Sequence, residues 1–273
     1  MGGELLLFDL DGTLLDSSRR IRASTLALLA ELMDEGVRVG LATGRSLRSA
    51  LPFAEQLQPN APLILFNGGL VWDPLTSTAV FERGLPREDA HLALRIAADL
   101  GIHANLYQGA EIAIAQESQT SRESEEKDGV PHIVVGELVA HCTTDPHKIL
   151  LIDESGLFTG FKERFRAVAK TPCTLVRSEP TYLEVLPAGV CKGSALPAVE
   201  AHVGIPASQV IAFGDGLNDA ELLAACGCGV AMGNALEAVQ ELADVVIGDC
   251  DSDAIERFLR GRFRGGEPKF PAS

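Results

Sequence analysis

The chain has 273 residues, of which 46% are hydrophobic and only 5% aromatic, so it can form one large or two modest domains around an aliphatic core. Its 38 acidic residues outnumber the 23 basic ones and give a formal net charge of -15. This balance argues against a nucleic-acid or anionic-membrane surface, because such surfaces need a basic patch. An anionic substrate must therefore be held by a local set of donors and a metal.

No apolar stretch approaches the roughly 20 residues of a membrane span, and the N-terminus runs directly into a predicted strand. We therefore expect a cytoplasmic protein. The six cysteines are scattered and lack paired metal-ligand spacing, which favours buried thiols over a zinc site. No exposed apolar stripe can be identified from the sequence, so a monomer and a homodimer both stay open.

The first element is the apolar run Leu5–Phe8, which is too short for a helix and indicates a buried central strand of a parallel sheet. Asp9 and Asp11 follow it, with Gly12 allowing a tight turn. In open α/β sheets this end of a strand faces the ligand-binding crevice. A surface turn or a calcium loop is the alternative, although residues 13–15 do not supply the oxygen ligands that an EF-hand needs.

The chain then alternates helices and strands up to residue 69. The predicted elements are a helix capped by Ser17 or Ser18 and ended by Gly36, a strand over Val37–Ala42, a helix over Ser46–Leu57 and a strand over Leu63–Phe66. The two strands end in Thr43-Gly44-Arg45 and in Asn67. This βαβαβ order predicts a doubly wound fold.

The rhythm changes after a predicted edge hairpin over Leu70–Phe81. Residues 84–189 mix helices and strands in an order that predicts a separate α+β cap domain, inserted into a core domain of residues 1–83 and 190–273. The polar run Glu117–Gly129 is interpreted as a solvated loop. Gly189 and the segment after Phe81 are the expected hinges.

The alternation of helices and strands that is typical of a doubly wound fold resumes at Lys192-Gly193, before a predicted helix over Ser194–His202. The strand Val210–Phe213 follows and ends in the polar run 214–219, and two further strands are predicted near residues 228–232 and 245–247. We expect the tail, Gly261–Ser273, to be frayed. No strand is followed by a GxGxxG pattern, which weighs against a dinucleotide-binding site.

Polar residues thus follow four predicted strands, and a lysine stands at a helix start. Because the carboxyl ends of parallel strands share one edge of the sheet, the fold gathers these distant residues into one crevice. The residues are Asp9, Asp11, Thr43, Asn67, Lys192, Asp215, Asn218 and Asp219. Each has an ordinary structural alternative, a turn or a solvated charge, but their coincidence at strand ends indicates a catalytic site.

These motifs resemble the haloacid dehalogenase-like hydrolases and, among them, the Cof-type phosphatases with a C2 cap. The similarity lies in DLDGT at 9–13 with its preceding strand, ATGR at 42–45, Lys192-Gly193, GDGLNDAELL at 214–223 and VAMGNA at 230–235. It covers the core on both sides of the insertion. The family often has alanine at the position of Gly69 and methionine at that of Leu222.

The resemblance implies a Mg²⁺-dependent phosphatase of small phosphomonoesters such as sugar phosphates. Asp9 would be the nucleophile that forms an aspartyl-phosphate, and Asp11 the general acid and base. Magnesium would be held by the Asp9 carboxylate, the Asp11 carbonyl and the Asp215 carboxylate. Asp219 would be an outer or alternative ligand.

The resemblance also implies which groups cradle the transferring phosphoryl oxygens. They would be the Thr43 hydroxyl, the Leu10 and Gly44 N–H groups, Lys192 and Asn218. Arg45 and Asn67 are weaker candidates, for substrate contact or for bracing the cap.

Two other functions stay open at this stage. A phosphotransferase or sugar phosphomutase of the same superfamily would keep the chemistry and change the acceptor. A non-catalytic sensor of phosphorylated metabolites would keep only the binding site, but it would have no use for an acid and base beside a nucleophile. The sequence does not identify the substrate or the cap residues that select it.

Overall fold

The structure is a computed structural model, and it describes residues 4–265 of the chain. The chain divides into two compact units. Unit 1 comprises Met1–Gly44, Leu51–Phe81 and Cys191–Ser273, and unit 2 comprises Arg45–Ala50 and Glu82–Val190. Each unit is built on a sheet of its own.

Unit 1 contains an eight-stranded sheet in the order β14-β13-β12-β1-β2-β3-β4-β5. From β14 to β3 the neighbouring strands are parallel, and β4 is antiparallel to β3. Its strands are β1 (Leu5–Phe8), β2 (Arg38–Ala42), β3 (Leu63–Leu65), β4 (Leu70–Asp73), β5 (Thr78–Glu82), β12 (Val210–Gly214), β13 (Cys228–Ala231) and β14 (Val245–Val246). The predicted α/β fold with a parallel sheet is therefore confirmed, as is the edge hairpin.

The chain leaves β1 toward β2 and β3, and it returns after the insertion as β12 on the other side of β1. The order of the strands thus reverses between β1 and β12. Such a switch point is where open α/β sheets leave a crevice for a ligand, at the carboxyl ends of the strands. The sheet topology alone therefore locates the candidate site.

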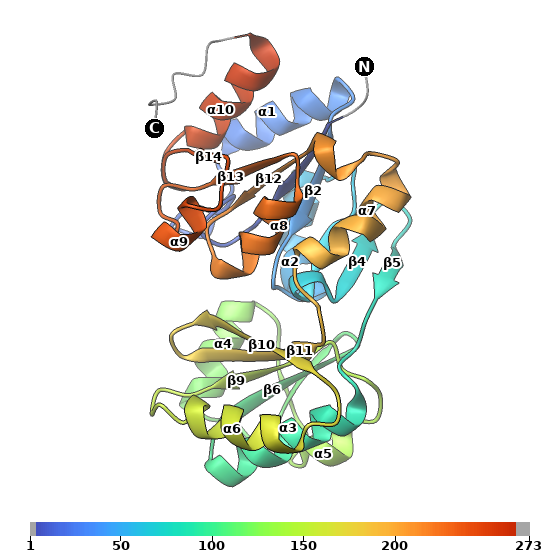
Figure 1. Ribbon diagram of the computed structural model, residues 1–273, viewed down its shortest axis with the longest axis vertical. Coiled ribbons are helices and arrows are strands. Elements are labelled where there is room, and N and C mark those ends of the chain that lie inside the picture. Colours follow the sequence, from blue (N-terminus) through green and yellow to red (C-terminus); the bar gives the residue numbers. More distant parts are fainter. Residues whose placement is uncertain (1–3, 266–273) are drawn as a thin grey trace. The chain divides into compact units, whose positions relative to one another are not determined.

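Helices cover both faces of this sheet (Figure 1). On one face, α7 (Leu196–Val203) and α8 (Ala220–Ala225) pack on the odd-numbered side chains of β1. On the other face, the rings of Phe8 and Phe213 stack with centroids 4.5 Å apart, and Phe258 of α10 (Ala254–Arg264) meets Phe213 edge-on. Burial on both faces explains why β1 is an unbroken apolar run.

Helix α1 (Ala23–Asp34) starts later than the sequence predicts. Its N-cap is Arg22, which makes no side-chain capping bond, so the prediction that Ser17 or Ser18 caps the helix is wrong. The reason is a local turn, because the Asp16 carboxylate accepts hydrogen bonds from the Ser18 and Arg20 amides. The predicted stop holds: the helix ends at Asp34, and Gly36 follows at φ 96°.

Unit 2 contains a six-stranded sheet in the order β10-β11-β9-β6-β7-β8. Its pairs are antiparallel except β7 with β8. The strands are β6 (His103–Gln108), β7 (Glu111–Ile114), β8 (Ile133–Val134), β9 (Lys148–Ile152), β10 (Cys173–Glu179) and β11 (Tyr182–Pro187). Helices α3 (Arg87–Leu100) and α6 (Phe158–Val168) pack side by side in its apolar core, together with the short helix α5 (Leu138–His141).

The polar run predicted as a loop over Glu117–Gly129 is largely helical, so that prediction is wrong. Helix α4 (Gln119–Asp128) starts with a capping box between Ser118 and Ser121 and ends at Gly129, whose φ is 65°. The sequence pattern hides this helix because α4 has no apolar residue. Capping and side-chain hydrogen bonds, rather than an apolar stripe, fix it.

The predicted frayed tail also starts too early. Helix α10 continues to Arg264, and Arg264 forms an ion pair with Glu35 while Arg262 pairs with Glu4. The remaining tail residues, 266–273, lie outside the described part of the chain. Between residues 4 and 265, no helix combines the length and apolar character needed to cross a membrane.

Candidate active site

The site begins where β1 and β12 end side by side. Phe8 pairs with Phe213 in register, and the Asp9 amide donates to the Phe213 carbonyl at 3.0 Å. Asp9 and Asp215 therefore leave neighbouring strands at the same edge. Gly12 turns the chain at φ 75°, and any Cβ there would collide with the Asp215 carboxylate. The glycine is thus needed both for the turn and for the close approach of the two loops.

At this edge, Lys192 contacts one residue from before the insertion and one from after it. Its ammonium donates to Asp9 Oδ1 and to Asp219 Oδ1, each at 2.6 Å, and its side chain is fully buried. It immediately precedes the 3₁₀ helix η2 (Gly193–Ala195), where Gly193 packs so closely on Glu221 that no side chain fits. The lysine is thereby held on a rigid turn between two carboxylates.

Asp219 has both carboxylate oxygens engaged. Oδ1 accepts from Lys192, and Oδ2 accepts from the backbone amides of Asp215 and Gly216 at 3.1 and 3.0 Å. It lies in the 3₁₀ helix η4 (Leu217–Asp219) and is fully buried. Asp219 therefore orders the loop that carries Asp215, which fits an outer position better than that of a primary metal ligand.

Carboxylate oxygens of Asp9, Asp215 and Asp219 lie within 4.8 Å of one another. Burial raises the pKa of Asp9 well above its usual range; Lys192 opposes the rise, and the charges of Asp219, Asp215 and Asp11 add to it. Four acids thus face one ammonium. An oxygen-rich, excess-negative site of this kind suits a hard divalent cation, so the residues present fit Mg²⁺.

Asp215 has a donor on each oxygen. The Thr13 hydroxyl donates to Oδ1 at 3.0 Å, and the Asn234 amide donates to Oδ2 at 3.3 Å. Burial, followed by the charge of Asp219, raises the pKa of Asp215 to about 6, while the Thr13 hydrogen bond and Lys192 limit the rise. The two donors fix the orientation of the carboxylate.

The ends of β2 and β3 add a second group of polar residues. Thr43 is buried and pairs by backbone with Ile64 and Asn67, at 2.8 and 3.1 Å. Asn67 stands at φ 54° in the 3₁₀ helix η1 (Phe66–Gly68), and its Oδ1 accepts from Asn218 Nδ2 at 2.9 Å. Gly44 lies directly against the Asn67 amide. A contiguous strip at the same edge of the sheet is thus formed by Thr43, Gly44, Asn67 and Asn218.

Leu10 and Asp11 occupy the turn after Asp9. Leu10 is buried, and its carbonyl accepts from the amides of Thr13 and Leu15, whereas Asp11 is exposed to solvent. Arg45 differs from the other candidates because it belongs to unit 2, where its guanidinium donates to Ser49. Of the predicted site residues, all except Arg45 therefore lie in unit 1 at one sheet edge.

Thr13 and Asn234 were not among the predicted site residues, although both contact Asp215. Each lies inside a motif already singled out, DLDGT and VAMGNA, so the signal was present. Their short polar side chains are equally common in ordinary turns. Only the folded chain shows that they meet on one carboxylate.

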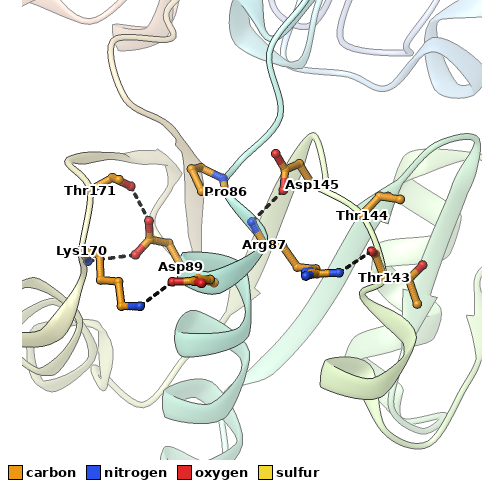
Figure 2. A pocket seen from close by; sticks show the side chains of 9 residues that line it. Pro86, Arg87, Asp89, Thr143, Thr144, Asp145, Lys170 and Thr171 are labelled. Atoms are coloured by element: carbon orange, nitrogen blue, oxygen red, sulfur yellow. Dashed lines mark hydrogen bonds and ion pairs between the residues drawn. The ribbon is translucent and has the colours of Figure 1, made fainter.

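Unit 2 has a cavity of about 370 Å³ at the start of α3, which Figure 2 shows. Its polar groups bond to each other: Asp145 accepts from the Arg87 amide, and Asp89 accepts from the Lys170 amide and the Thr171 hydroxyl. The cavity contains no group of carboxylates without donors. It therefore lacks the acid cluster that distinguishes the site in unit 1.

Comparison with known proteins gives a consistent result. The sequence model of the haloacid dehalogenase-like hydrolases matches residues 6–259. The chain is 28% identical to the 5-amino-6-(5-phospho-D-ribitylamino)uracil phosphatase YitU of Bacillus subtilis (strain 168), over 95% of this chain and 97% of the relative. It is 32% identical to the HMP-PP phosphatase of Serratia proteamaculans (strain 568), over 94% of both chains.

Solved structures agree over nearly the whole chain. A haloacid dehalogenase-like hydrolase from Bacteroides thetaiotaomicron superposes with a TM-score of 0.89 at 26% identity, covering 96% of this chain and 100% of its own. TM0651 from Thermotoga maritima gives 0.85 at 26% identity, covering 96% and 97%. The similarity therefore includes the inserted segment as well as the strands that carry the site.

Proposed function

Because the chain belongs to the haloacid dehalogenase-like hydrolases and is a phosphatase of that family, we propose that it hydrolyses small phosphomonoesters with Mg²⁺, through an aspartyl-phosphate on Asp9. The observation that carries this proposal is the contact of Lys192 with both Asp9 and Asp219 beside Asp215. This contact brings together a buried candidate nucleophile, a positively charged side chain and a group of carboxylates that can bind a metal ion.

Asp9 is the proposed nucleophile because its environment prepares one of its oxygens for attack. Lys192 occupies Oδ1 and stabilises the ionised form, against the burial that disfavours it. The other oxygen, Oδ2, forms a bond to phosphorus while the bond from phosphorus to the leaving alkoxide breaks. Water then attacks phosphorus, which frees the Asp9 carboxylate and releases inorganic phosphate.

Asp11 is the proposed acid and base. It is solvent-exposed and lies two residues beyond Asp9, on the turn that Gly12 makes possible. In the first step it gives its proton to the leaving oxygen, and in the second step it takes a proton from the attacking water. Asp11 therefore regains in the second step the proton that it loses in the first.

The proposed phosphate cradle uses groups whose positions the fold fixes. They are the Thr43 hydroxyl, the Leu10 and Gly44 amides, the Lys192 ammonium and the Asn218 amide, from three strand ends and one helix start. Asn67 holds Asn218 through a 2.9 Å hydrogen bond, so we assign it a supporting role. Donors fixed where charge develops commonly lower a barrier by about 3 to 4 kcal/mol each.

The residues that would hold Mg²⁺ are Asp9 and Asp215 through their carboxylates and Asp11 through its carbonyl oxygen. Asp219 stays outside this set because it is fully buried and its oxygens accept from the Lys192 ammonium and two backbone amides. Asp215 is partly exposed and has one neutral side-chain donor on each oxygen. When bound, the ion neutralises acids that otherwise repel a dianionic phosphate, by about 4 kcal/mol per charge pair at roughly 4 Å and an effective dielectric of about 20. Binding as well as reaction therefore depends on the cation.

We propose that unit 2 is the cap that selects the substrate. Its bounds, Glu82–Val190 with the segment Arg45–Ala50, are close to the insertion predicted over 84–189. The two curated relatives are named for a ribityl-aminouracil phosphate and for HMP-PP, both small phosphorylated metabolites. A substrate of that size, with a polar organic part, is the class that we propose.

The test is phosphate release by the purified protein with Mg²⁺ from a panel of sugar, nucleotide, pyrimidine and cofactor phosphates. Asp9→Asn should abolish release, while Asp34→Asn, an exposed acid at the end of α1, should leave it unchanged. Borohydride reduction during turnover should convert Asp9 to homoserine. Absence of release from every ester, or unchanged release by Asp9→Asn, would contradict the proposal; isomerised hexose phosphate without free phosphate would indicate a mutase.

A further inference from the structure

We propose that Asn234 is a positioning residue for the reaction, holding the Asp215 carboxylate in the orientation in which it binds the cation. This inference rests on the proposed function, because it assigns Asp215 to a metal site. Asn234 follows β13 in the Met232–Leu236 loop, outside the five strand-end and helix-start positions that supply the other groups. Asn234 reaches the site through its side-chain amide, which contacts Asp215.

The contacts of the Asn234 amide determine which of its atoms faces the site. Oδ1 accepts from the Cys250 backbone amide at 2.9 Å, so Nδ2 must lie on the other side. Nδ2 donates to the Gly12 carbonyl at 2.8 Å and to Asp215 Oδ2 at 3.3 Å. Both partners are acceptors, and only the NH₂ group can satisfy them. One side chain thus joins three loops.

Asn234 and Thr13 act on the same carboxylate from different parts of the chain. Thr13 donates to Oδ1 and Asn234 to Oδ2, so rotation of the Asp215 carboxylate would break one bond or the other. Gly12 packs against the remaining side of the carboxylate, so closely that a Cβ there would collide with Asp215. Hydrogen-bonded partners of this kind orient metal-binding carboxylates, and their loss typically weakens metal binding about 10- to 100-fold.

Asn234 also anchors the loop 248–253 through Cys250. An experiment can separate this structural role from the positioning of Asp215. That loop has a second anchor: the Asp251 carboxylate accepts from the Ser17 amide at 2.8 Å, and its carbonyl accepts from Arg22. Asp251 makes no described contact with Asp215. Asp251→Ala therefore loosens the same loop while leaving the donors of Asp215 in place, which makes it the matched control.

The experiment measures Mn²⁺ binding to the full-length protein by calorimetry, with no substrate present. Wild type should bind, and Asp215→Asn should not. Asn234→Ala should bind about 10- to 100-fold more weakly, whereas Asp251→Ala should stay within about twofold of wild type. At saturating metal, the kcat of Asn234→Ala should recover most of its wild-type value, because the residue acts through metal occupancy.

The outcomes separate this inference from the proposed function. If wild type binds no Mn²⁺, the metal site itself is wrong and both fall. If wild type binds but Asn234→Ala binds equally well, or if Asp251→Ala weakens binding as much, only the role of Asn234 is overturned. Should Asn234→Ala fail to fold, Asn234→Ser replaces it, because a serine hydroxyl is too short to reach Asp215 and Cys250 together.

Discussion

Lys192 Nζ lies 2.6 Å from a carboxylate oxygen of Asp9 and 2.6 Å from one of Asp219, and the lysine side chain has no exposed surface. Burial alone would lower the pKa of Lys192, but the Asp219 and Asp9 carboxylates outweigh it and raise that pKa. The ammonium therefore stays charged. Stability and the proposed chemistry both depend on this one cation.

Lys192→Met is expected to be strongly destabilised. It leaves Asp9 and Asp219 as buried acids without their cation, and breaking a buried ion pair by removing one partner typically costs about 3–5 kcal/mol. Urea denaturation at pH 7.5 should show this loss, and phosphate release should fall at least about 10³-fold. The destabilisation should shrink toward pH 5, because the uncompensated carboxylates can then take up protons.

The double variant Lys192→Met with Asp219→Asn separates the two roles. It removes one of the uncompensated charges, so part of the lost stability should return, while activity should remain absent. Recovery of activity in the double variant would mean that Lys192 acts only by neutralising Asp219. An unchanged stability in Lys192→Met would contradict the buried ion pairs themselves.

Asp9→Asn is expected to be at least as stable as wild type when metal is removed by a chelator. The pKa of Asp9 is raised in the folded state, so folded protein holds this proton more tightly than unfolded protein does. Above the usual pKa of an aspartate, ionisation of Asp9 therefore reduces stability as the pH rises. Removing the charge should raise the melting temperature at pH 7.5 by a few degrees, about 1–2 kcal/mol.

Differential scanning fluorimetry checks this result, with Asp34→Asn as the control for loss of a surface acid. Adding Mg²⁺ should stabilise wild type more than Asp9→Asn, because the asparagine is a poorer ligand. A melting temperature for Asp9→Asn clearly below that of wild type, without metal, would show that the ionised carboxylate is stabilising. The electrostatic description of the site would then be wrong.

Most of the fold could be predicted because apolar strands and glycine stops leave strong local patterns. Leu5–Phe8 is apolar at every position because both faces of β1 are covered, and Asp9 must then lie at its end. The edge at which the site residues meet follows from strand order, which the alternation of elements implies. Their catalytic roles stay predictions.

What could not be predicted depends on side chains that meet only after folding. Helix α4 has no apolar residue, so periodicity cannot reveal it, and Ser118 with Gly129 sets its ends. Asn234 resembles any turn asparagine until Cys250, Gly12 and Asp215 are seen around it. The ends of α4 are set by local capping, whereas Asn234 is held by hydrogen bonds to residues distant in the sequence, and neither leaves a hydrophobic pattern.

Helix α4 should be less protected against amide exchange than helix α3 of the same unit. It is attached to β6 by hydrogen bonds from Asn105 to Ser124 and from Tyr107 to Asp128, both 2.8 Å, with no apolar residue of its own to bury. Amide exchange measured by mass spectrometry should therefore be faster over 119–128 than over α3. Tyr107→Phe should accelerate it about fivefold further, the equivalent of about 1 kcal/mol for a hydrogen bond, and leave α3 unchanged. Protection of α4 equal to that of α3 would contradict this view.

His147 should make unit 2 less stable below pH 6.5. Burial lowers the pKa of His147, and the carboxylate of Glu82, 3.7 Å from Nε2, opposes that effect. Unfolded protein then binds this proton more readily than folded protein, so stability is complete above pH 6.5 and declines as the pH falls toward the lowered pKa. The loss is limited to about 1.4 kcal/mol per pH unit for one proton.

The aromatic residues allow the two units to be followed separately. The single tryptophan, Trp72, lies in unit 1, and both tyrosines, Tyr107 and Tyr182, lie in unit 2. Urea titrations between pH 7.5 and pH 5 should show the pH effect in the tyrosine near-UV signal. His147→Gln should flatten it, whereas Glu82→Gln should steepen it, because the carboxylate that supports the charged imidazole is gone. A pH profile that is the same in wild type and His147→Gln would assign the acid sensitivity of unit 2 to other groups.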